Sequence, residues 1–568
     1  MPGFFITNTN KVPRLINYDN NLCFCGEFYY NEWTIKWNSL NKYVDDKVFF
    51  QNDRYIIVLD GVILNKRLLM KKYHKNFWQD TILEMLENNN ETFFIEFRGV
   101  FAGAILDKSK NKWIIYTDQC GSRLLLSYCK DNKVAIGSQL NYFKDWMNDN
   151  NINIKIDNCW VKDFFSFGYT IDKRSIISNV HRVYPGCYQI IEKGEIQKFI
   201  YYRIKKENIN RNISAEQAID ILDKLFIKAI EQIIKKDQEY GYKTIFDISG
   251  GLDSRMNIGV AVKYNESKIK DILAITFAQK NSLDDIISSE ISELLNLDHI
   301  YYFLDGGNCL TDIDDLVFMN QGFNFYLGAT GIKRFLSIID KKIYGMSVVG
   351  ILGDIYEGAM ITDGEGEVNW NYNRFRTSKK FNVTVDGNRE EFDDNEILWF
   401  YIRGILAGMN TGFIRQNFVE PITPYGNVEF MEFCFSLPYE MRVKQHIYRQ
   451  WMIKKYPEMA NIKYSGTGLP VSLHDKIDYL KILPRRIKNR IYRATFGAKK
   501  EWSMNPLDIW YQENIALRNY IQNYYKENIE LLDFDESLKK DVEFLFTKGN
   551  MLERSMALTL LSAVKQFI

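Results

Sequence analysis

Short apolar runs of strand length alternate with turn residues up to about residue 205. They lie at 54–64, 97–107, 112–118, 133–138 and 186–192, and Gly, Asp and Asn punctuate them. Runs of this kind bounded by turn residues are typical of strands. One segment, 78–89, instead has apolar residues at helical spacing. The pattern predicts an antiparallel sheet with a few helices.

The pattern changes after a polar linker at 203–214. Ser214 is placed to cap a helix over 215–236, whose apolar residues recur every three or four positions. Strand and helix patterns then alternate, with strands at 243–248, 271–278 and 299–304 and helices at 255–264 and 284–296. Such alternation predicts a parallel sheet with crossover helices. A further strand and Gly-rich turn follows at 342–354, and the chain is largely helical from about Glu396. We therefore expect an α/β protein with two domains, 1–205 and 215–568.

Composition excludes some function classes. The 73 Lys and Arg residues balance 72 Asp and Glu residues, which gives no electrostatic reason to expect a nucleic acid or membrane partner. No apolar run suggests a membrane span or a signal peptide, so a cytoplasmic location is expected. The eight cysteines and five histidines form no metal-binding spacing, and we expect reduced structural cysteines.

The most informative segment is SGGLDS, Ser249–Ser254, between a predicted strand and a predicted helix. Its two glycines allow close approach of an anion, and backbone N–H groups at a helix start can bind phosphate. Asp253 would repel phosphate unless it holds a cation, which suggests Mg²⁺. The alternative is an ordinary Gly-rich turn, but both serines and the Asp argue against it.

The segment resembles the signature of the ATP-pyrophosphatase superfamily, and the order of the other segments resembles asparagine synthases, including β-lactam synthetases and lasso-peptide cyclases. The resemblance implies ATP and Mg²⁺ as cosubstrate and cofactor. It implies nucleotide contacts from the phosphate loop and from the turn after the strand at 342–348, namely Ile248, Ser249, Gly250, Gly251, Asp253, Ser254, Val349 and Gly350.

FRGVFAGAILD, YTDQCGSRLLLSY and AIGSQL resemble elements of the family's N-terminal glutaminase domain, which implies an Ntn-type α+β sandwich. The family's nucleophile is a Cys exposed as residue 2, where this chain has Pro2. Asp60-Gly61-Val62 stands where the family has Asn-Gly-Glu. An Asp carboxylate cannot donate the hydrogen bond that an oxyanion needs. We expect no glutamine hydrolysis.

In the second half, 349–358 resembles the family's second metal-binding element. The match implies that Asp354 joins Asp253 as an Mg²⁺ ligand and that both are catalytic. The family's substrate-side Glu aligns with Ile351, and Glu357 is one candidate replacement. The family's catalytic Lys has no clean counterpart; Lys463 is nearest, and a solvent-facing Lys is the alternative reading of it.

Two classes of function follow. The first is an ATP- and Mg²⁺-dependent ligase that adenylates a carboxylate, free or carrier-bound, and joins it to an amine or ammonia. Within that class, a specialised ligase or cyclase of the β-lactam synthetase or lasso-peptide cyclase type is the alternative to an asparagine synthase. The second class is a non-catalytic nucleotide-binding scaffold. The sequence leaves the carboxylate, the amine source and a homodimeric state open.

Overall fold

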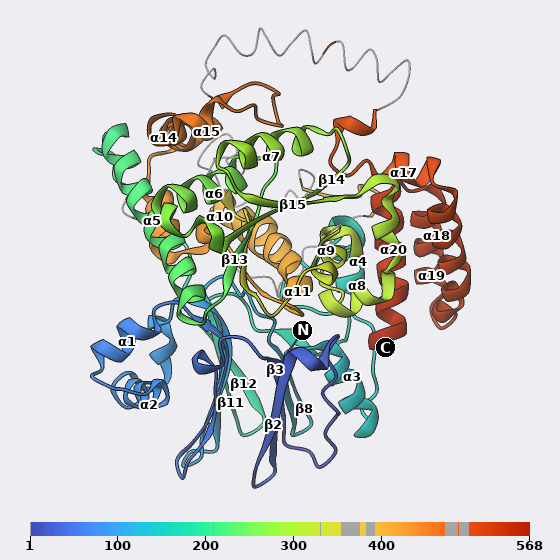
Figure 1. Cartoon of the computed structure of the whole chain (residues 1–568). Coiled ribbons are helices and arrows are strands. Elements are labelled where there is room, and N and C mark those ends of the chain that lie inside the picture. The colour runs from blue at the N-terminus through green and yellow to red at the C-terminus, as the bar shows by residue number, and fades with distance from the viewer. Residues whose placement is uncertain are drawn as a thin grey trace.

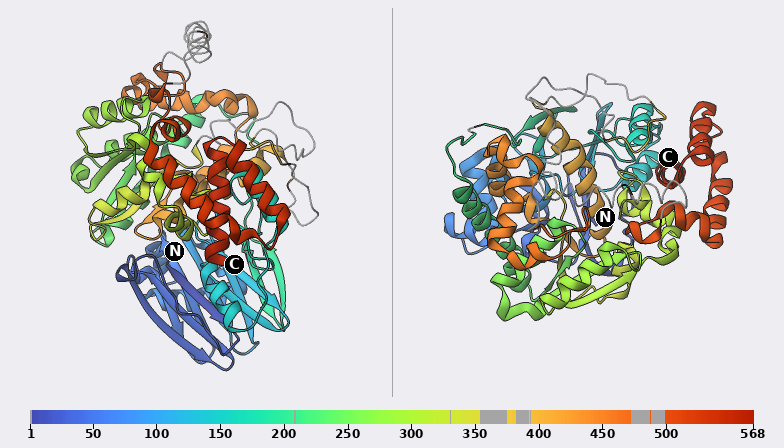
Figure 2. Two further views of the ribbon diagram at one scale, coloured as in Figure 1. Left: turned by 90° about the vertical axis from the view of Figure 1, so that its right-hand side faces the viewer. Right: turned by 90° about the horizontal axis from the view of Figure 1, so that it is seen from above.

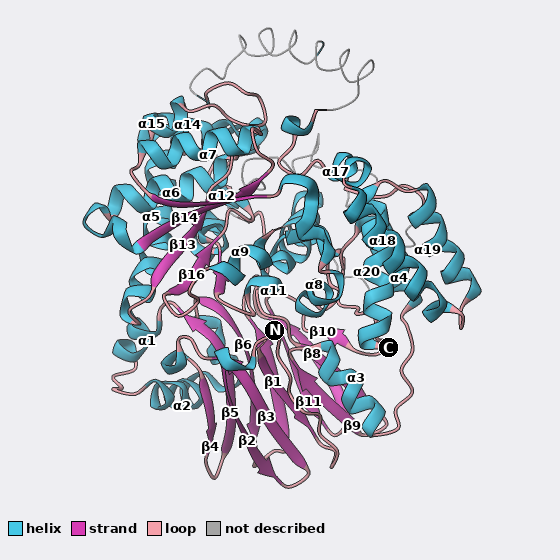
Figure 3. Cartoon of the chain, turned by 45° about the vertical axis from the view of Figure 1, so that its right-hand side comes forward, coloured by secondary structure: helices cyan, strands magenta, loops and turns pink. Residues whose placement is uncertain are grey.

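Two six-stranded antiparallel sheets form the N-terminal part of the protein (Figures 1 and 3). The computed structural model describes residues 2–207, 209–329, 331–353, 375–381, 392, 394–471, 487 and 499–568. The first sheet has the order β10 (His181–Arg182), β8 (Leu126–Lys130), β9 (Lys133–Gly137), β1 (Gly3–Thr7), β3 (Trp33–Leu40) and β2 (Cys23–Tyr30). The second has the order β12 (Glu195–Ile200), β11 (Cys187–Glu192), β7 (Lys112–Thr117), β6 (Gly99–Asp107), β5 (Tyr55–Ile63) and β4 (Val48–Gln51).

The alternation of side chains along β5 shows how the two sheets pack. Ile56 and Val58 belong to the apolar cluster between the sheets, whereas Ile57 and Leu59 belong to the cluster beneath α1 (Lys66–Lys72) and α2 (Trp78–Asn89). Successive strand residues point to opposite faces, so a strand covered on both sides is apolar throughout. On the other side, α3 (Leu140–Asp149) covers the first sheet, and α4 (Asn158–Phe167) belongs to the same apolar cluster and packs against α20 (Met551–Phe567). This helix–sheet–sheet–helix arrangement confirms the predicted sandwich.

A five-stranded parallel sheet forms the centre of the second part. Its order is β15 (Asp298–Phe303), β14 (Ile272–Ala278), β13 (Lys243–Asp247), β16 (Tyr344–Val348) and β17 (Glu420–Ile422). The predicted helices are α5 (Ala215–Glu239), α6 (Leu252–Tyr264) and α7 (Leu283–Leu294), and Ser214 caps α5 in a capping box. The chain extends the sheet from β13 to β15 in one direction and continues with β16 and β17 on the other side of β13. Such a reversal opens a crevice at the carboxyl ends of the two strands, where ligands of open parallel sheets bind.

Helices surround this sheet and extend beyond it. They are α8 (Ile313–Asn320), α9 (Ile332–Ile338), α10 (Asn395–Trp399), α11 (Gly412–Arg415), α12 (Val428–Ser436), α13 (Tyr439–Arg442), α14 (His446–Lys455), α15 (Pro457–Asn461), α17 (Leu507–Glu513), α18 (Ile515–Asn528), α19 (Glu536–Lys548) and α20 (Met551–Phe567). The last four gather on one side of the molecule (Figure 2). The helical segment Asn395–Arg415 is long and apolar enough to span a membrane, but 83% of its apolar 18-residue window is buried inside the protein, as in a core helix. All eight cysteines are free, as predicted.

Candidate active site

The SGGLDS segment connects β13 to α6, with Gly251 as the residue that caps the helix. The two serine hydroxyls lie 2.9 Å apart, and the Ser254 hydroxyl accepts a hydrogen bond from the backbone N–H of Ser249. The N–H of Gly251 donates to the Ser249 hydroxyl at 3.2 Å. Strand, loop and helix therefore occur where the sequence predicts them, and the two serines hold the loop in a tight turn.

Asp284, at the start of α7, is a member of this site that the sequence reasoning missed. Its carboxylate accepts a hydrogen bond from the N–H of Gly250 at 2.9 Å, and burial raises the pKa of Asp284 above its ordinary value. On the other side of Gly250, its carbonyl accepts from the N–H of Ser465 at 3.0 Å. A Cβ added at Gly250 would lie 2.6 Å from the Ser465 Cβ, so only glycine fits between these neighbours. Two segments distant in sequence thus fix the phosphate loop.

The turn after β16 packs directly on Asp253. A Cβ added at Gly353 would lie 2.2 Å from the Asp253 Cγ, and one at Gly350 would lie 3.0 Å from the Asp253 Cβ. Between these glycines, Leu352 is buried and has a φ of +79°, which is uncommon for a residue with a side chain. The second loop is therefore held close to the first, with Gly353 against the Asp253 carboxylate.

The predicted partners of Asp253 fall beyond Gly353. Asp354 and Glu357 lie outside the described residues. Among the residues that the structure describes, no group of three or more His, Cys, Asp or Glu side chains is arranged to hold a metal ion. The pairing of Asp253 with Asp354 stays a prediction, and the position of Gly353 beside Asp253 is the nearest observation to it.

A cavity of about 500 Å³ opens between the two loops, at the carboxyl ends of β13 and β16. This volume is in the range of ligand pockets. Its lining comes from the two loops, β13, β14, the start of α9 and the turn before it, α11 and the residue before it, and the C-terminal region: Asp247, Ile248, Ser249, Gly251, Asp253, Ser254, Ile275, Phe277, Leu327, Gly328, Ile332, Val349, Gly350, Ile351, Thr411, Arg415, Met504 and Asn505. The structure thus brings seven of the eight predicted nucleotide contacts to one cavity; Gly250, the eighth, lies in the same loop.

An ion pair forms part of the cavity wall. Arg415 donates two hydrogen bonds to the Asp247 carboxylate and one to the Ser347 hydroxyl, and its side chain is 7% exposed. Burial raises the pKa of Asp247 although the guanidinium opposes the shift. Sequence reasoning missed this pair, and the one available signal was an Asp at the end of a buried strand, directly before the phosphate loop.

Lys463 lies near the phosphate loop but does not line the cavity. Its side chain is exposed, and its backbone carbonyl accepts a hydrogen bond from Arg255. In the segment that resembles the family's Lys loop, Ser465 makes the contact with Gly250. The solvent-facing reading of Lys463 fits its exposure.

In the N-terminal sandwich, the residues at the expected glutaminase positions are buried. Pro2 is buried, and a Cβ on the next residue, Gly3, would lie 1.9 Å from the Ser138 hydroxyl and 3.8 Å from the Asp60 carboxylate. Asp60 is 2% exposed and binds Arg123 at 2.9 Å and Lys47 at 3.3 Å. Burial raises the pKa of Asp60, but the two cations and the Ser39 hydroxyl more than offset this and hold it below its ordinary value. The start of the chain and Asp60 therefore meet, as a glutaminase site would require, but Asp60 is a buried ion-pair partner.

Comparison with known proteins supports the resemblance found in the sequence. A family model described as a glutamine amidotransferase domain matches residues 45–202. Over 451 residues the chain is 24% identical to the "Putative asparagine synthetase (glutamine-hydrolyzing) 2" of Methanocaldococcus jannaschii, covering 76% of this chain and 81% of that protein. Together these matches support an asparagine-synthase-like family for the chain.

Two solved structures also match the chain. A glutamine phosphoribosylpyrophosphate amidotransferase from B. subtilis is 14% identical, with a TM-score of 0.23, over 47% of this chain and 58% of that chain. An NAD+ synthetase from Burkholderia pseudomallei is 12% identical, with a TM-score of 0.18, over 45% of this chain and 98% of that one. These scores are too low to support an inference about either half.

Proposed function

We propose that this asparagine-synthase-like ligase is ATP- and Mg²⁺-dependent, adenylates a carboxylate and forms an amide without hydrolysing glutamine. The observation that carries the proposal is the cavity at the switch point of the parallel sheet. There the phosphate loop and the 349–353 turn meet at Asp253. Backbone donors at a helix start suit the phosphates, and a carboxylate oxygen of Asp253 suits a hard cation such as Mg²⁺. Asp354 is the proposed second ligand.

In the proposed reaction, a carboxylate oxygen of the substrate attacks the α-phosphorus of ATP, and the bond from that phosphorus to the β-phosphate oxygen breaks. Pyrophosphate leaves, and the N–H groups at the start of α6 and the serine hydroxyls stabilise its charge. The amine then attacks the acyl carbon, AMP leaves with the bonding electron pair, and the amine proton passes to solvent. Such chemistry depends mainly on alignment of the reactants and on stabilisation of phosphate charge. A bound Mg²⁺ would contribute charge neutralisation.

ATP–pyrophosphate exchange with a panel of carboxylates tests the proposal. Labelled pyrophosphate should enter ATP only when a suitable carboxylate is present. Binding of MgATP without exchange for every carboxylate offered would instead favour a nucleotide-binding scaffold. Exchange with peptide or carrier-bound acids alone would favour a specialised ligase or cyclase.

The absence of glutaminase activity is the second part of the proposal. It is supported by Pro2, which is buried, and by Asp60, whose carboxylate is committed to Arg123 and Lys47. We expect the purified protein to release glutamate from glutamine at the rate of buffer alone, and Pro2→Cys to leave this rate unchanged because Asp60 remains. Glutamate release above the buffer rate by the wild-type protein would contradict this.

The third part concerns the carboxylate. Ile351 lines the cavity and packs on the helical backbone at Gly408, where an added Cβ would lie 2.8 Å from the Ile351 Cγ2. The Ile351 carbonyl is held by the Thr423 hydroxyl at 2.7 Å. An apolar side chain held here offers no acid to pair with the amino group of free aspartate. We therefore propose that free aspartate is a poor substrate and that a larger or carrier-bound carboxylate is preferred.

One assay distinguishes a ligase that uses free aspartate poorly from an ammonia-dependent asparagine synthase. With MgATP, aspartate and ammonium, we expect little asparagine or AMP from the wild-type protein, and Ile351→Glu is the change that should raise both. Stoichiometric asparagine and AMP at ordinary enzymatic rates would refute the prediction, and loss of that activity in Glu357→Gln would then assign the acid to Glu357.

A further inference from the structure

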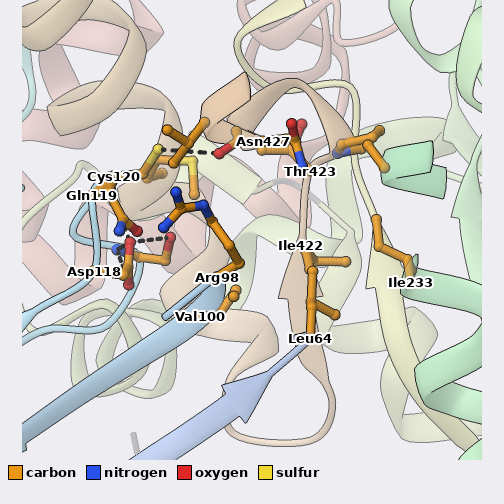
Figure 4. Close-up of a pocket in the computed structure, with 17 residues that line it drawn as sticks. Leu64, Arg98, Val100, Asp118, Gln119, Cys120, Ile233, Ile422, Thr423 and Asn427 are labelled. Carbon is orange, nitrogen blue, oxygen red and sulfur yellow. Dashed lines mark hydrogen bonds between the residues drawn. The ribbon is translucent and has the colours of Figure 1, made fainter. Parts of the chain in front are cut away.

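A buried loop of the N-terminal sandwich, residues 118–123, reaches the second half of the protein. Asp118 organises it by accepting hydrogen bonds from the N–H groups of Phe101, Cys120 and Ser122 at 2.9–3.2 Å. All six residues of the loop are buried. In Figure 4, Asp118 and Cys120 lie on one side of a cavity of about 40 Å³, and Ile422 and Thr423 lie on the other. The loop is therefore fixed internally and faces the end of β17.

The loop and its neighbour Arg182 contact residues beside the active-site cavity. The Ser122 carbonyl accepts a hydrogen bond from the Gln416 side chain at 2.7 Å, and Gln416 follows Arg415 of the cavity wall. Arg182, on β10, donates to the Gly121 carbonyl at 2.6 Å and to the Asn410 side chain at 2.8 Å. Asn410 directly precedes Thr411, another residue of the cavity wall.

A third contact reaches β17. Arg123 binds the Glu420 carboxylate as well as Asp60, and Lys47 lies 4.0 Å from the same Glu420 oxygen. Glu420 begins β17, which ends two residues later; Thr423 follows and holds the Ile351 carbonyl. The side chains of Lys47, Asp60, Arg123 and Glu420 are all 6% exposed or less.

Charges buried to this degree are poor stabilisers, because the loss of hydration offsets much of their attraction. Burial lowers the pKa of Arg182 to about 10 even though Tyr184 and Asp118 oppose the shift, which shows the cost of placing a guanidinium there. Such groups instead fix the orientation of their partners, because each hydrogen bond holds a partner at a set distance. In this protein all three contacts converge on one segment, residues 410–423, which carries one wall of the cavity.

We propose that the N-terminal sandwich serves as a positioning domain for the ligase site. In this role, Arg182, Arg123 and the 118–123 loop hold the 410–423 segment against the phosphate loop. Arg182, Arg123 and Gln416 are positioning residues that touch no substrate. The sandwich would thus have a role even though, under the proposed function, it hydrolyses no glutamine. The positioning role rests on the proposed ligase reaction only for the choice of assay.

The test compares Arg182→Met and Gln416→Met with the matched control Lys66→Met in the full chain. Lys66 is also buried and links Asp46 of the sandwich to Glu239, the last residue of α5, and to Tyr240, which follows it. Within the part of the chain that the structure describes, its hydrogen bonds and ion pairs involve no residue of the 410–423 segment. The measurements are kcat and KM for ATP in pyrophosphate exchange, the Kd for MgATP, and the midpoint of thermal unfolding.

We expect both test variants to lose at least 10-fold in exchange kcat at a temperature where they are fully folded. Arg182→Lys, which retains one of the two hydrogen bonds, should recover part of the loss. Lys66→Met should lower the unfolding midpoint and leave kcat unchanged. Wild-type kcat in folded Arg182→Met and Gln416→Met, or an equal loss in Lys66→Met, would overturn the proposal.

The experiment distinguishes failure of the positioning role from failure of the proposed ligase reaction. If the wild-type protein exchanges pyrophosphate with no carboxylate, the proposed activity fails, and MgATP affinity becomes the readout. A 10-fold weaker Kd in Arg182→Met with an unchanged Kd in Lys66→Met would then support the positioning role. Equal Kd values in all variants would refute it.

Discussion

Adding one methyl group at Gly353 should disable the site without altering any proposed ligand. The Cβ of Gly353→Ala would lie 2.2 Å from the Asp253 Cγ and 2.6 Å from both carboxylate oxygens. Carbon atoms in ordinary contact are about 3.5–4.0 Å apart, so the carboxylate must withdraw by about 1.5 Å. Displacement of a reacting or aligning group by about 1 Å can cost about 100-fold in rate. We therefore expect about a 100-fold loss in ATP–pyrophosphate exchange.

The assay pairs exchange kinetics with calorimetric titration of MgATP and with thermal unfolding. Asp253→Asn should weaken Mg²⁺-dependent nucleotide binding without unfolding the protein, and Gly353→Ala should resemble it. Gly259→Ala is the matched control, because Gly259 lies on the same helix as Asp253 and its added Cβ would meet only the flexible Met459 side chain, at 3.0 Å. A folded Gly353→Ala protein with wild-type exchange rate and MgATP affinity would refute the placement of the second loop against Asp253.

Two further changes test the phosphate loop and a buried carboxylate near the amino end of β13. Asp284→Ala removes the acceptor of the Gly250 N–H and should weaken MgATP binding about 10-fold, as expected for one hydrogen bond to a charged group. Asp284→Asn keeps an acceptor and should bind MgATP nearly as well as wild type. Tighter MgATP binding by the Ala variant would contradict this and show that the carboxylate competes with phosphate. Asp237 is fully buried, accepts hydrogen bonds from Tyr43, Thr244 and the N–H of Met346, and has its pKa raised by burial to about 6. The folded state therefore binds the extra proton between about pH 4 and 6, so this group's contribution to stability falls as pH rises through that window, by about 3 kcal/mol in all. Urea unfolding of wild type and Asp237→Asn from pH 4 to 7 should show the variant gaining relative stability with pH, and a constant difference would contradict the raised pKa.

The phosphate loop was predictable because its information is local. A buried strand, two glycines, two serines and a helix with its own cap occupy 22 consecutive residues, from Lys243 to Tyr264. Apolar runs bounded by turn residues likewise located β5, β6, β7, β9, β11 and the strands β13 to β16, and helical spacing located α2, α5, α6 and α7. The Gly-rich turn at 349–353 was predictable for the same reason, because a Gly-rich turn after a buried strand is a short-range signal.

The ion pair between Asp247 and Arg415 could not be predicted in this way, because the two residues are 168 positions apart. Each has an unremarkable local context, an Asp at a strand end and an Arg at the end of a helix. Only the parallel pairing of β13 with β16, which carries Ser347, places them together. The contact of Asp284 with Gly250 has the same origin, since it depends on how α7 returns to the sheet.

Asp60 shows how sequence and structure answer different questions about one residue. The residue type alone excludes an oxyanion donor, because a carboxylate only accepts hydrogen bonds. It does not say what the carboxylate does instead, and that depends on Arg123 and Lys47, which approach it from other segments. Because Arg123 also binds Glu420, the cation that neutralises Asp60 is part of the contact that joins the sandwich to the second half. An amide at this position would leave the buried cations with less compensating charge, so the residue at position 60 and the buried interface are physically coupled.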